Sequence, residues 1–193
     1  GSIRYNERGI GEEVWCALLA AAPFSNTYTL AVDPAVAQAY NLHTMSDLSQ
    51  VASSLKAGTT LEFLNRQDGL RGVQNEYGFT FKDAKGIDGA TRYVPLSSGD
   101  VQVVDAFSTD GLLKKYNLTV LADDKGFFPP YYGVPLVRQE TIEEHPELQD
   151  VINRMMATLD TDTMRELNYQ VDVEHKSPKE VAHDFLVAKG LVK

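Results

Sequence analysis

Residues 27–34 (TYTLAVDP) decide the fold of this chain. The first six residues are mostly β-branched, aromatic or aliphatic, which is typical of a strand. Asp33 followed by Pro34 is typical of a helix start, because the aspartate can cap the helix and proline suits its first turn. A strand that leads directly into a helix, here ending near Tyr40, is the repeating unit of an α/β fold.

The same alternation continues on the C-terminal side of this unit. A helix capped by Ser46 and a helix from Asp68-Gly69 toward Tyr77 are predicted from their capping residues and apolar spacing. Strands alternating with helices favour a mainly parallel sheet with helices on both faces. The predicted strands are 59–64 (TTLEFL), 101–107 (VQVVDAF) and 118–122 (LTVLA).

The two ends of the chain have a different character. Residues 7–21 place apolar side chains on one face of a helix, which Pro23 ends. From Gly133 onward, a strand over 134–138 leads into three predicted helices. The last helix begins with Ser177-Pro178-Lys179-Glu180, which matches a capping box.

Composition limits the class of protein. The chain has 193 residues and a net charge of −9, with 43% apolar residues. This length suits one large domain or two small lobes, and the acidic balance argues against binding a phosphate backbone. Residues 14–24, the longest uncharged stretch near the start, are too short to span a bilayer.

A search for catalytic patterns gives little. The four histidines show no metal-ligand spacing, and the sequence contains no GxSxG, GxGxxG or P-loop motif. Cys16 lies among apolar residues and is predicted to be a small buried side chain. We therefore expect no enzyme activity, no cofactor and no metal. Four aspartates at strand ends and turns are predicted to bond backbone groups: Asp105, Asp110, Asp123 and Asp124.

Aromatic residues and one arginine offer better candidates for a binding site. Tyr28 begins a strand, Phe107 ends one, and residues 127–133 (FFPPYYG) close the α/β region. Arg66 directly follows the predicted strand 59–64. Ring faces hold a quaternary ammonium group, and a guanidinium pairs with a carboxylate, so this set suits a ligand that carries both.

Several separated motifs strengthen this interpretation, because they resemble the substrate-binding component of bacterial ABC importers for quaternary amines such as glycine betaine, choline and carnitine. The resemblance runs from about Phe24 to the C-terminus. The motifs are SNTYTLAV (25–32), MSDL (45–48), LEFLNRQDGL (61–70), VDAFSTDG (104–111), LADDKGFFPPYYGVPLVR (121–138), TMRELNYQVDVE (163–174) and SPKEVAHDFL (177–186).

The resemblance implies a type II periplasmic-binding-protein-like α/β fold with two lobes, the second inserted into the first. Residues 25–132 would be the inserted lobe and 133–193 the C-terminal part of the first lobe, while 1–24 stay unassigned. The N-terminal part of the first lobe, with its YPEYTGT-like segment, has no counterpart here. The C-terminal helices would then expose an apolar face, which predicts a homodimer or an exchanged segment.

The resemblance also implies a binding site. Tyr28 and Tyr131 match cage tyrosines, although adjacent Tyr132 leaves that register open, and Phe107 stands where a further cage tyrosine is common. Asn26 matches a polar residue of the cleft, and Arg66 matches the arginine that pairs with the ligand carboxylate. The expected ligand-binding residues are Asn26, Tyr28, Arg66, Phe107, Thr109 and Tyr131.

The resemblance further implies delivery of the ligand to an ABC permease. The expected location is extracytoplasmic, either periplasmic or attached to the membrane as a lipoprotein or permease fusion. The alternative is a regulatory domain that binds an effector with the same fold. Neighbouring sequence separates the two, since a permease favours import and a helix-turn-helix favours regulation.

Overall fold

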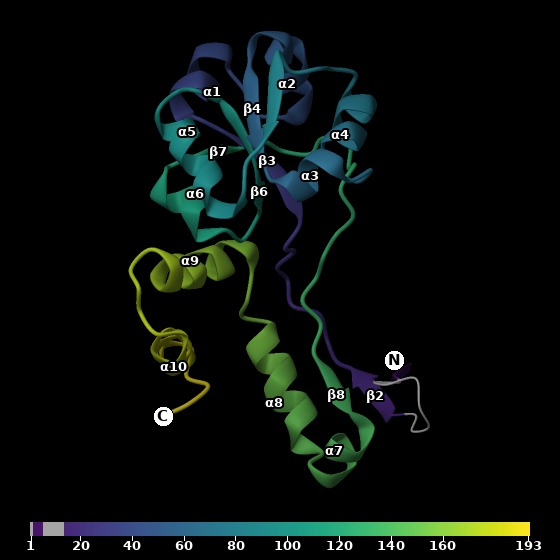
Figure 1. The fold of residues 1–193 in the computed structure, drawn as a ribbon. Coiled ribbons are helices and arrows are strands. Elements are labelled where there is room, and N and C mark those ends of the chain that lie inside the picture. The colour runs from purple at the N-terminus through teal and green to yellow at the C-terminus, as the bar shows by residue number, and fades with distance from the viewer. Residues whose placement is uncertain (1, 6–13) are drawn as a thin grey trace.

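The chain contains two sheets joined by two long crossing segments. The computed structural model describes residues 2–5 and 14–193. A five-stranded sheet has the order β5-β4-β6-β3-β7, and a three-stranded sheet has the order β1-β2-β8. The two sheets lie at opposite ends of the molecule (Figure 1). We call the region of the five-stranded sheet, residues 28–120, the five-stranded lobe.

Four of the five strands of this sheet run in the same direction, which confirms the prediction of a mainly parallel sheet, and only β3 runs against them. β4 runs parallel to β5 and β6, but β3 runs antiparallel to β6 and β7. Alternation of strands and helices along the chain does not fix the direction of β3, which enters from outside the lobe. The strands are β3 (Tyr28–Val32), β4 (Lys56–Thr59), β5 (Asp83–Gly86), β6 (Val103–Phe107) and β7 (Thr119–Val120).

Helix caps in this lobe follow the sequence closely. Asp33 caps α1 as predicted, accepting hydrogen bonds from the amides of Ala35 and Val36 at 2.8 and 3.3 Å. α2 begins two residues earlier than predicted, because Thr44 rather than Ser46 caps it. The helices are α1 (Pro34–Tyr40), α2 (Met45–Val51), α3 (Leu61–Asn65), α4 (Leu70–Tyr77), α5 (Tyr93–Ser97) and α6 (Gly111–Lys115), with 3₁₀ turns at Ala52–Ser54 and Gly89–Arg92.

The predicted strand 59–64 is wrong over residues 60–64, since it overlaps the observed strand only at Thr59. β4 ends at Thr59, and the Thr60 hydroxyl accepts a hydrogen bond from the Phe63 amide at 3.2 Å, which caps α3. Phe63 is fully buried, so its apolar character reflects a helix packed on the core. Arg66 consequently follows a helix and not a strand.

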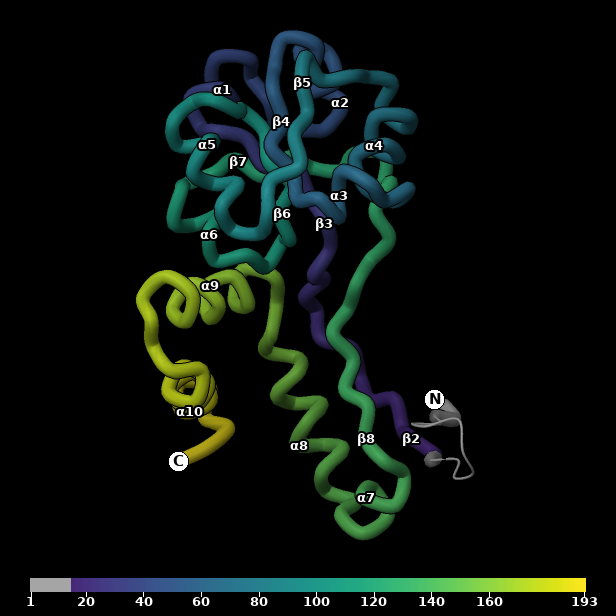
Figure 2. The backbone as a smooth tube through the Cα atoms, viewed as in Figure 1, coloured from purple at the N-terminus to yellow at the C-terminus, as the bar shows by residue number. Residues whose placement is uncertain are grey.

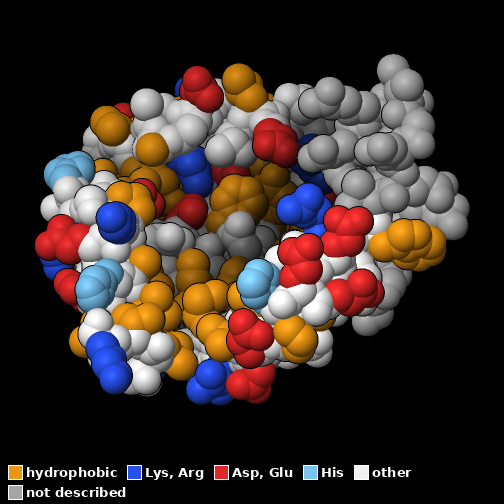
Figure 3. Space-filling model, turned by 90° about the horizontal axis from the view of Figure 1, so that it is seen from below, with side chains coloured by type: hydrophobic (Ala, Val, Ile, Leu, Met, Phe, Trp, Pro, Cys, Tyr) orange, Lys and Arg blue, Asp and Glu red, His pale blue; other side chains and the backbone are white. Residues whose placement is uncertain are grey.

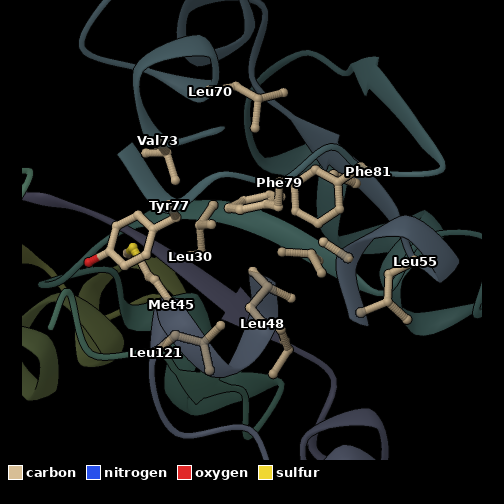
Figure 4. Close-up of a cluster of buried hydrophobic side chains, with 14 of the residues drawn as sticks. Leu30, Met45, Leu48, Leu55, Leu70, Val73, Tyr77, Phe79, Phe81 and Leu121 are labelled. Carbon is tan, nitrogen blue, oxygen red and sulfur yellow. The ribbon is translucent and has the colours of Figure 1, made fainter. Parts of the chain in front are cut away.

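The main core lies on one face of this sheet (Figure 4). β3 contributes Leu30 from the middle of the sheet, and α2 and α4 cover it with leucines and valines. A smaller cluster around Tyr93 and Val104 packs on the other face. The labelled side chains in Figure 4 are Leu30, Met45, Leu48, Leu55, Leu70, Val73, Tyr77, Phe79, Phe81 and Leu121.

The remaining part of the chain is built on the three-stranded sheet. Val14–Leu18 forms β2, so the predicted helix 7–21 is wrong over this stretch, and residues 6–13 lie outside the described residues. Exposed Trp15 beside buried Cys16 shows the two-residue alternation of a strand. The other two strands are β1 (Ser2–Tyr5), paired with β2, and β8 (Leu136–Arg138), which confirms the strand predicted over 134–138.

Four helices, one more than predicted, follow β8. Ser177 caps the last of them as predicted, since its hydroxyl accepts a hydrogen bond from the Glu180 amide at 3.1 Å. No helix in the described part of the chain has the length and apolar character that a membrane span requires. The helices are α7 (Gln139–Glu144), α8 (Glu147–Met156), α9 (Thr161–Asp172) and α10 (Pro178–Ala188).

The crossing segments, residues 19–27 and 121–135, run side by side between the two sheets (Figure 2). The amides of Leu19, Ala22 and Asn26 donate hydrogen bonds across to the second segment, at 3.1, 2.8 and 2.9 Å. Their acceptors are the carbonyls of Pro135, Gly133 and Tyr131. The second structural link is α9, which packs on α6 of the five-stranded lobe through the Lys114–Glu166 ion pair.

Replacing Leu48 by alanine tests the core assignment. Leu48 is fully buried, so Leu48→Ala should lower the free energy of unfolding by about 2–5 kcal/mol, which is the usual cost of replacing a buried leucine by alanine. Val94→Ala is the control, because Val94 is 65% exposed on α5 and should change it by less than about 0.5 kcal/mol. Urea denaturation measures both, and equal effects would contradict the assignment.

Candidate ligand-binding site

A pocket of about 490 Å³ opens where the five-stranded lobe meets the crossing segments. Its volume lies within the range of about 300–1,000 Å³ that is usual for small-molecule sites. Every predicted ligand-binding residue except Thr109 lines it. The lining residues are Phe24, Asn26, Tyr28, Glu62, Arg66, Phe107, Tyr131, Tyr132 and Gly133.

One wall of the pocket is made of packed rings. Tyr28 at the start of β3 pairs with Phe107 at the end of antiparallel β6, and their rings stack with centroids 4.7 Å apart. Phe63 and Phe128 support the Tyr28 ring from behind, at 5.1 and 6.1 Å. Since Tyr28 is only 8% exposed, this wall holds its ring at a fixed angle.

A second pair of rings comes from the crossing segments. Tyr131 and Tyr132 both line the pocket and are 43% and 55% exposed. Gly133 allows the chain to pass close to Phe24, because a Cβ at this glycine would lie 2.4 Å from the ring. The structure therefore brings both tyrosines of the YYG sequence to the site.

Arg66 stands between two carboxylates. Its Nε and Nη2 donate to the two oxygens of Asp68 at 2.7 and 2.6 Å, and Nη1 donates to Glu62 Oε1 at 3.1 Å. These bonds raise the pKa of Arg66 and lower the pKa of Asp68. A guanidinium has five N–H donors, so two remain for a ligand.

Glu62 is a lining residue that sequence reasoning missed. It lies one helical turn before Arg66 on α3, a spacing that brings acid and base together. The predicted strand over 59–64 hid this relation, because a strand would turn alternate side chains to opposite faces. The signal that could have revealed Glu62 was Thr60, because a threonine at this position can cap a helix that begins at Leu61.

The Tyr28 hydroxyl faces Glu62. Burial is the main cause that raises the pKa of Tyr28, and the negative charge of Glu62 adds to it. The phenol therefore stays neutral at physiological pH and can donate a hydrogen bond. Because Phe107 stacks on this ring and most of it is buried, only its small exposed part can contact a ligand.

Thr109 is not among the lining residues but contacts one of them, so its role in ligand binding stays a prediction. Its hydroxyl donates to Asn26 Oδ1 at 2.7 Å, and its side chain is almost fully buried. Asn168 of α9 holds the Thr109 carbonyl at 2.9 Å. Because Oδ1 of Asn26 is occupied in this way, Asn26 can offer its amide N–H groups to a ligand.

Asp110 and Asp123 bond nearby backbone amides, which confirms the turn role predicted for them, whereas Asp105 and Asp124 bond amides far away in the sequence, which corrects that prediction. Asp123 accepts from Phe127 and Phe128 at 3.0 and 2.8 Å, and Asp124 accepts from Ser46 at 3.1 Å. Within residues 2–5 and 14–193, no group of three His, Cys, Asp or Glu side chains could hold a metal ion. The remaining two bonds are Thr60 to Asp105 at 2.7 Å and Phe107 to Asp110 at 3.1 Å.

Known proteins are similar to this chain in sequence and in fold. An ergothioneine transport permease/ergothioneine binding protein of Helicobacter pylori, EgtU, is 38% identical over 92% of this chain and 32% of its own length. A carnitine transport binding protein of Listeria monocytogenes, OpuCC, is 37% identical over 84% of this chain and 53% of its own length. The chain therefore spans about half, or less, of the length of these relatives.

Solved structures of binding proteins have the same fold as this chain. A glycine betaine/carnitine/choline ABC transporter structure superposes with a TM-score of 0.85 at 35% identity, over 91% of this chain and 65% of the other. The Escherichia coli protein YehZ without ligand gives a TM-score of 0.75 at 29% identity. Residues 6–188 match the family OpuAC, described as the substrate binding domain of ABC-type glycine betaine transport systems. The chain therefore belongs to this family of binding domains and has its periplasmic-binding-protein-like fold.

Proposed function

We propose that this chain binds a quaternary ammonium compound, such as glycine betaine, carnitine, choline or ergothioneine, for uptake by an ABC importer. One observation carries the proposal: the rings of Tyr28, Phe107, Tyr131 and Tyr132 and the guanidinium of Arg66 line a single pocket. The family, and the names of the carnitine- and ergothioneine-binding relatives, support the same ligand class.

The rings supply the site for the ammonium group. A quaternary ammonium has no N–H to donate, so ring faces hold it best, each contributing about 0.5–2 kcal/mol. Glu62 adds a negative charge to this part of the pocket. Phe107 keeps a ring face without needing a hydroxyl, and Asn26 provides a polar group beside it.

Arg66 supplies the site for a carboxylate. Asp68 and Glu62 hold the guanidinium in place before any ligand arrives, which reduces the entropy lost on binding. The two remaining N–H groups then receive the ligand carboxylate. The two acids also offset the positive charge of Arg66, so recognition here depends on hydrogen-bond geometry more than on net attraction.

The proposal includes a permease as the partner and an extracytoplasmic location. The name of the Helicobacter pylori relative joins a permease and a binding protein in one chain. Binding would bend the crossing segments and bring the two ends of the molecule together, as in hinged binding proteins. A thermal-shift screen across quaternary amines tests the ligand class, because a ligand stabilises the folded state by mass action.

Replacing Tyr131 by alanine tests the cage. If the ring faces the ammonium group, Tyr131→Ala should weaken choline and glycine betaine binding by about 0.5–2 kcal/mol. Tyr40→Ala is the matched control, because Tyr40 is equally exposed but lies on α1, outside the pocket lining. Titration calorimetry measures both, and an unchanged dissociation constant for Tyr131→Ala removes this ring from the site.

Replacing Arg66 by glutamine tests whether this residue binds the carboxylate end of the ligand and not the ammonium end. Arg66→Gln should weaken glycine betaine binding by about 1.5–3 kcal/mol, the range for hydrogen bonds to charged groups, and choline binding far less. Arg71→Gln serves as the control, because Arg71 is an exposed residue of α4 outside the pocket lining, and it should leave the affinity for both ligands unchanged. Equal losses for the two ligands would contradict a carboxylate role for Arg66.

We also propose that this chain self-associates through the apolar hollow next to α8, α9 and α10 (Figure 3). Val151 of α8 and Val187 of α10 are 48% and 44% exposed. A groove of about 510 Å³ between α9 and α10 includes Leu167 and Phe185. Charged residues such as Asp162, Glu166 and Asp184 also line this groove, so the proposal rests on the exposed apolar side chains beside them, which favour association.

Light scattering tests this association. The wild-type chain should form dimers at high concentration, and Val187→Glu should shift it toward monomer because a charge in an apolar contact is unfavourable. Val94→Glu, an exposed valine on α5 of the five-stranded lobe, should leave the dimer intact. A monomeric wild-type chain would refute the proposal.

A further inference from the structure

A buried ion pair lies directly behind the pocket. Arg92 and Asp105 are 6% and 1% exposed. Arg92 Nε donates to the Asp105 carbonyl at 2.7 Å and lies 3.4 Å from its Oδ1, while Nη1 donates to the Gly89 carbonyl at 2.6 Å. Such a pair is weak support for stability, because desolvation opposes the attraction between the charges.

Asp105 connects this pair to α3. Its Oδ1 accepts from the Thr60 amide at 2.7 Å, and its Oδ2 accepts from the Thr60 hydroxyl at 2.8 Å. The same hydroxyl accepts from the Phe63 amide and so caps α3. α3 spans only Leu61–Asn65, and a helix this short depends on its contacts for its position.

The same residues reach the ring wall. Asp105 and Phe107 are two residues apart on β6, so their side chains share one face of the sheet. Asp110 accepts a hydrogen bond from the Phe107 amide at 3.1 Å, and its Oδ2 lies 3.6 Å from Arg92 Nη2. One connected group thus holds the end of β6, which carries Phe107, and the start of α3, which carries Glu62 and leads to Arg66.

We propose that Thr60 and Asp105 are positioning residues that set the spacing between the ring wall and the charged wall of the pocket. This inference rests on the proposed function. A ligand with a cation at one end and a carboxylate at the other is sensitive to that spacing, because both ends must bind at once. A ligand without a carboxylate, such as choline, is less sensitive.

A substitution at Thr60 tests this role better than one at Asp105. Asp105→Asn would leave the buried charge of Arg92 without its anion and would destabilise the fold. Thr60→Val keeps the shape of the side chain and removes the hydroxyl, whereas Thr60→Ser keeps the hydroxyl. The control is Thr59→Val, because the adjacent Thr59 hydroxyl is buried and has no hydrogen-bond partner among the described residues. Titration calorimetry with glycine betaine and choline measures each variant.

Thr60→Val should weaken glycine betaine binding about fivefold more than choline binding, which corresponds to one net hydrogen bond. Thr60→Ser and Thr59→Val should keep the wild-type ratio of the two affinities. Partial unfolding would reduce the active fraction equally for both ligands and leave that ratio unchanged. An unchanged ratio in Thr60→Val, with wild-type binding intact, overturns the inference.

If the proposed function itself is wrong, the calorimetry gives a different result. A wild-type chain that binds neither ligand contradicts quaternary amine binding, and amide hydrogen exchange then still tests the position of α3. In that case Phe63 should exchange faster in Thr60→Val than in Thr60→Ser, because its amide loses the cap. Equal exchange rates would overturn the positioning role as well.

Discussion

The antiparallel pairing of β3 with β6 is the constraint on which the site depends. It sets Tyr28 opposite Phe107 at the edge of the sheet where the chain enters the five-stranded lobe. In an all-parallel sheet, the start of one strand would lie far from the end of its neighbour. The mixed sheet instead places a strand start and a strand end together, and the two rings stack there with the core behind them.

The charged wall complements this ring wall. Arg66 is fixed by Asp68 and Glu62, so the pocket offers directional N–H donors within a region whose net charge is not positive. On the proposed function, this arrangement would disfavour simple anions and suit a zwitterion, which is the kind of molecule that the carnitine-binding and ergothioneine-binding relatives are named for.

Much of the candidate site could be predicted from sequence, because its residues stand at element ends that carry strong local signals. Asp33-Pro34 marked the end of β3, and the aromatic run over 127–133 marked the return of the chain. Glu62 was missed since a short apolar run fits a strand or a buried helix equally well, and only Thr60 distinguishes them. The direction of β3 and the existence of β2 could not be predicted, because both depend on contacts between distant segments.

The crossing segments have a consequence for how this domain can respond. Phe24 and Asn26 lie on one segment and Tyr131, Tyr132 and Gly133 on the other, so the backbone that joins the two ends of the molecule is also a wall of the pocket. If the proposed ligand binds there and bends the crossing segments, ligand binding and the angle between the two ends of the molecule would be thermodynamically linked. On the proposed function, a partner that binds both ends would then change the affinity for the ligand, and the ligand would change the affinity for the partner by the same factor.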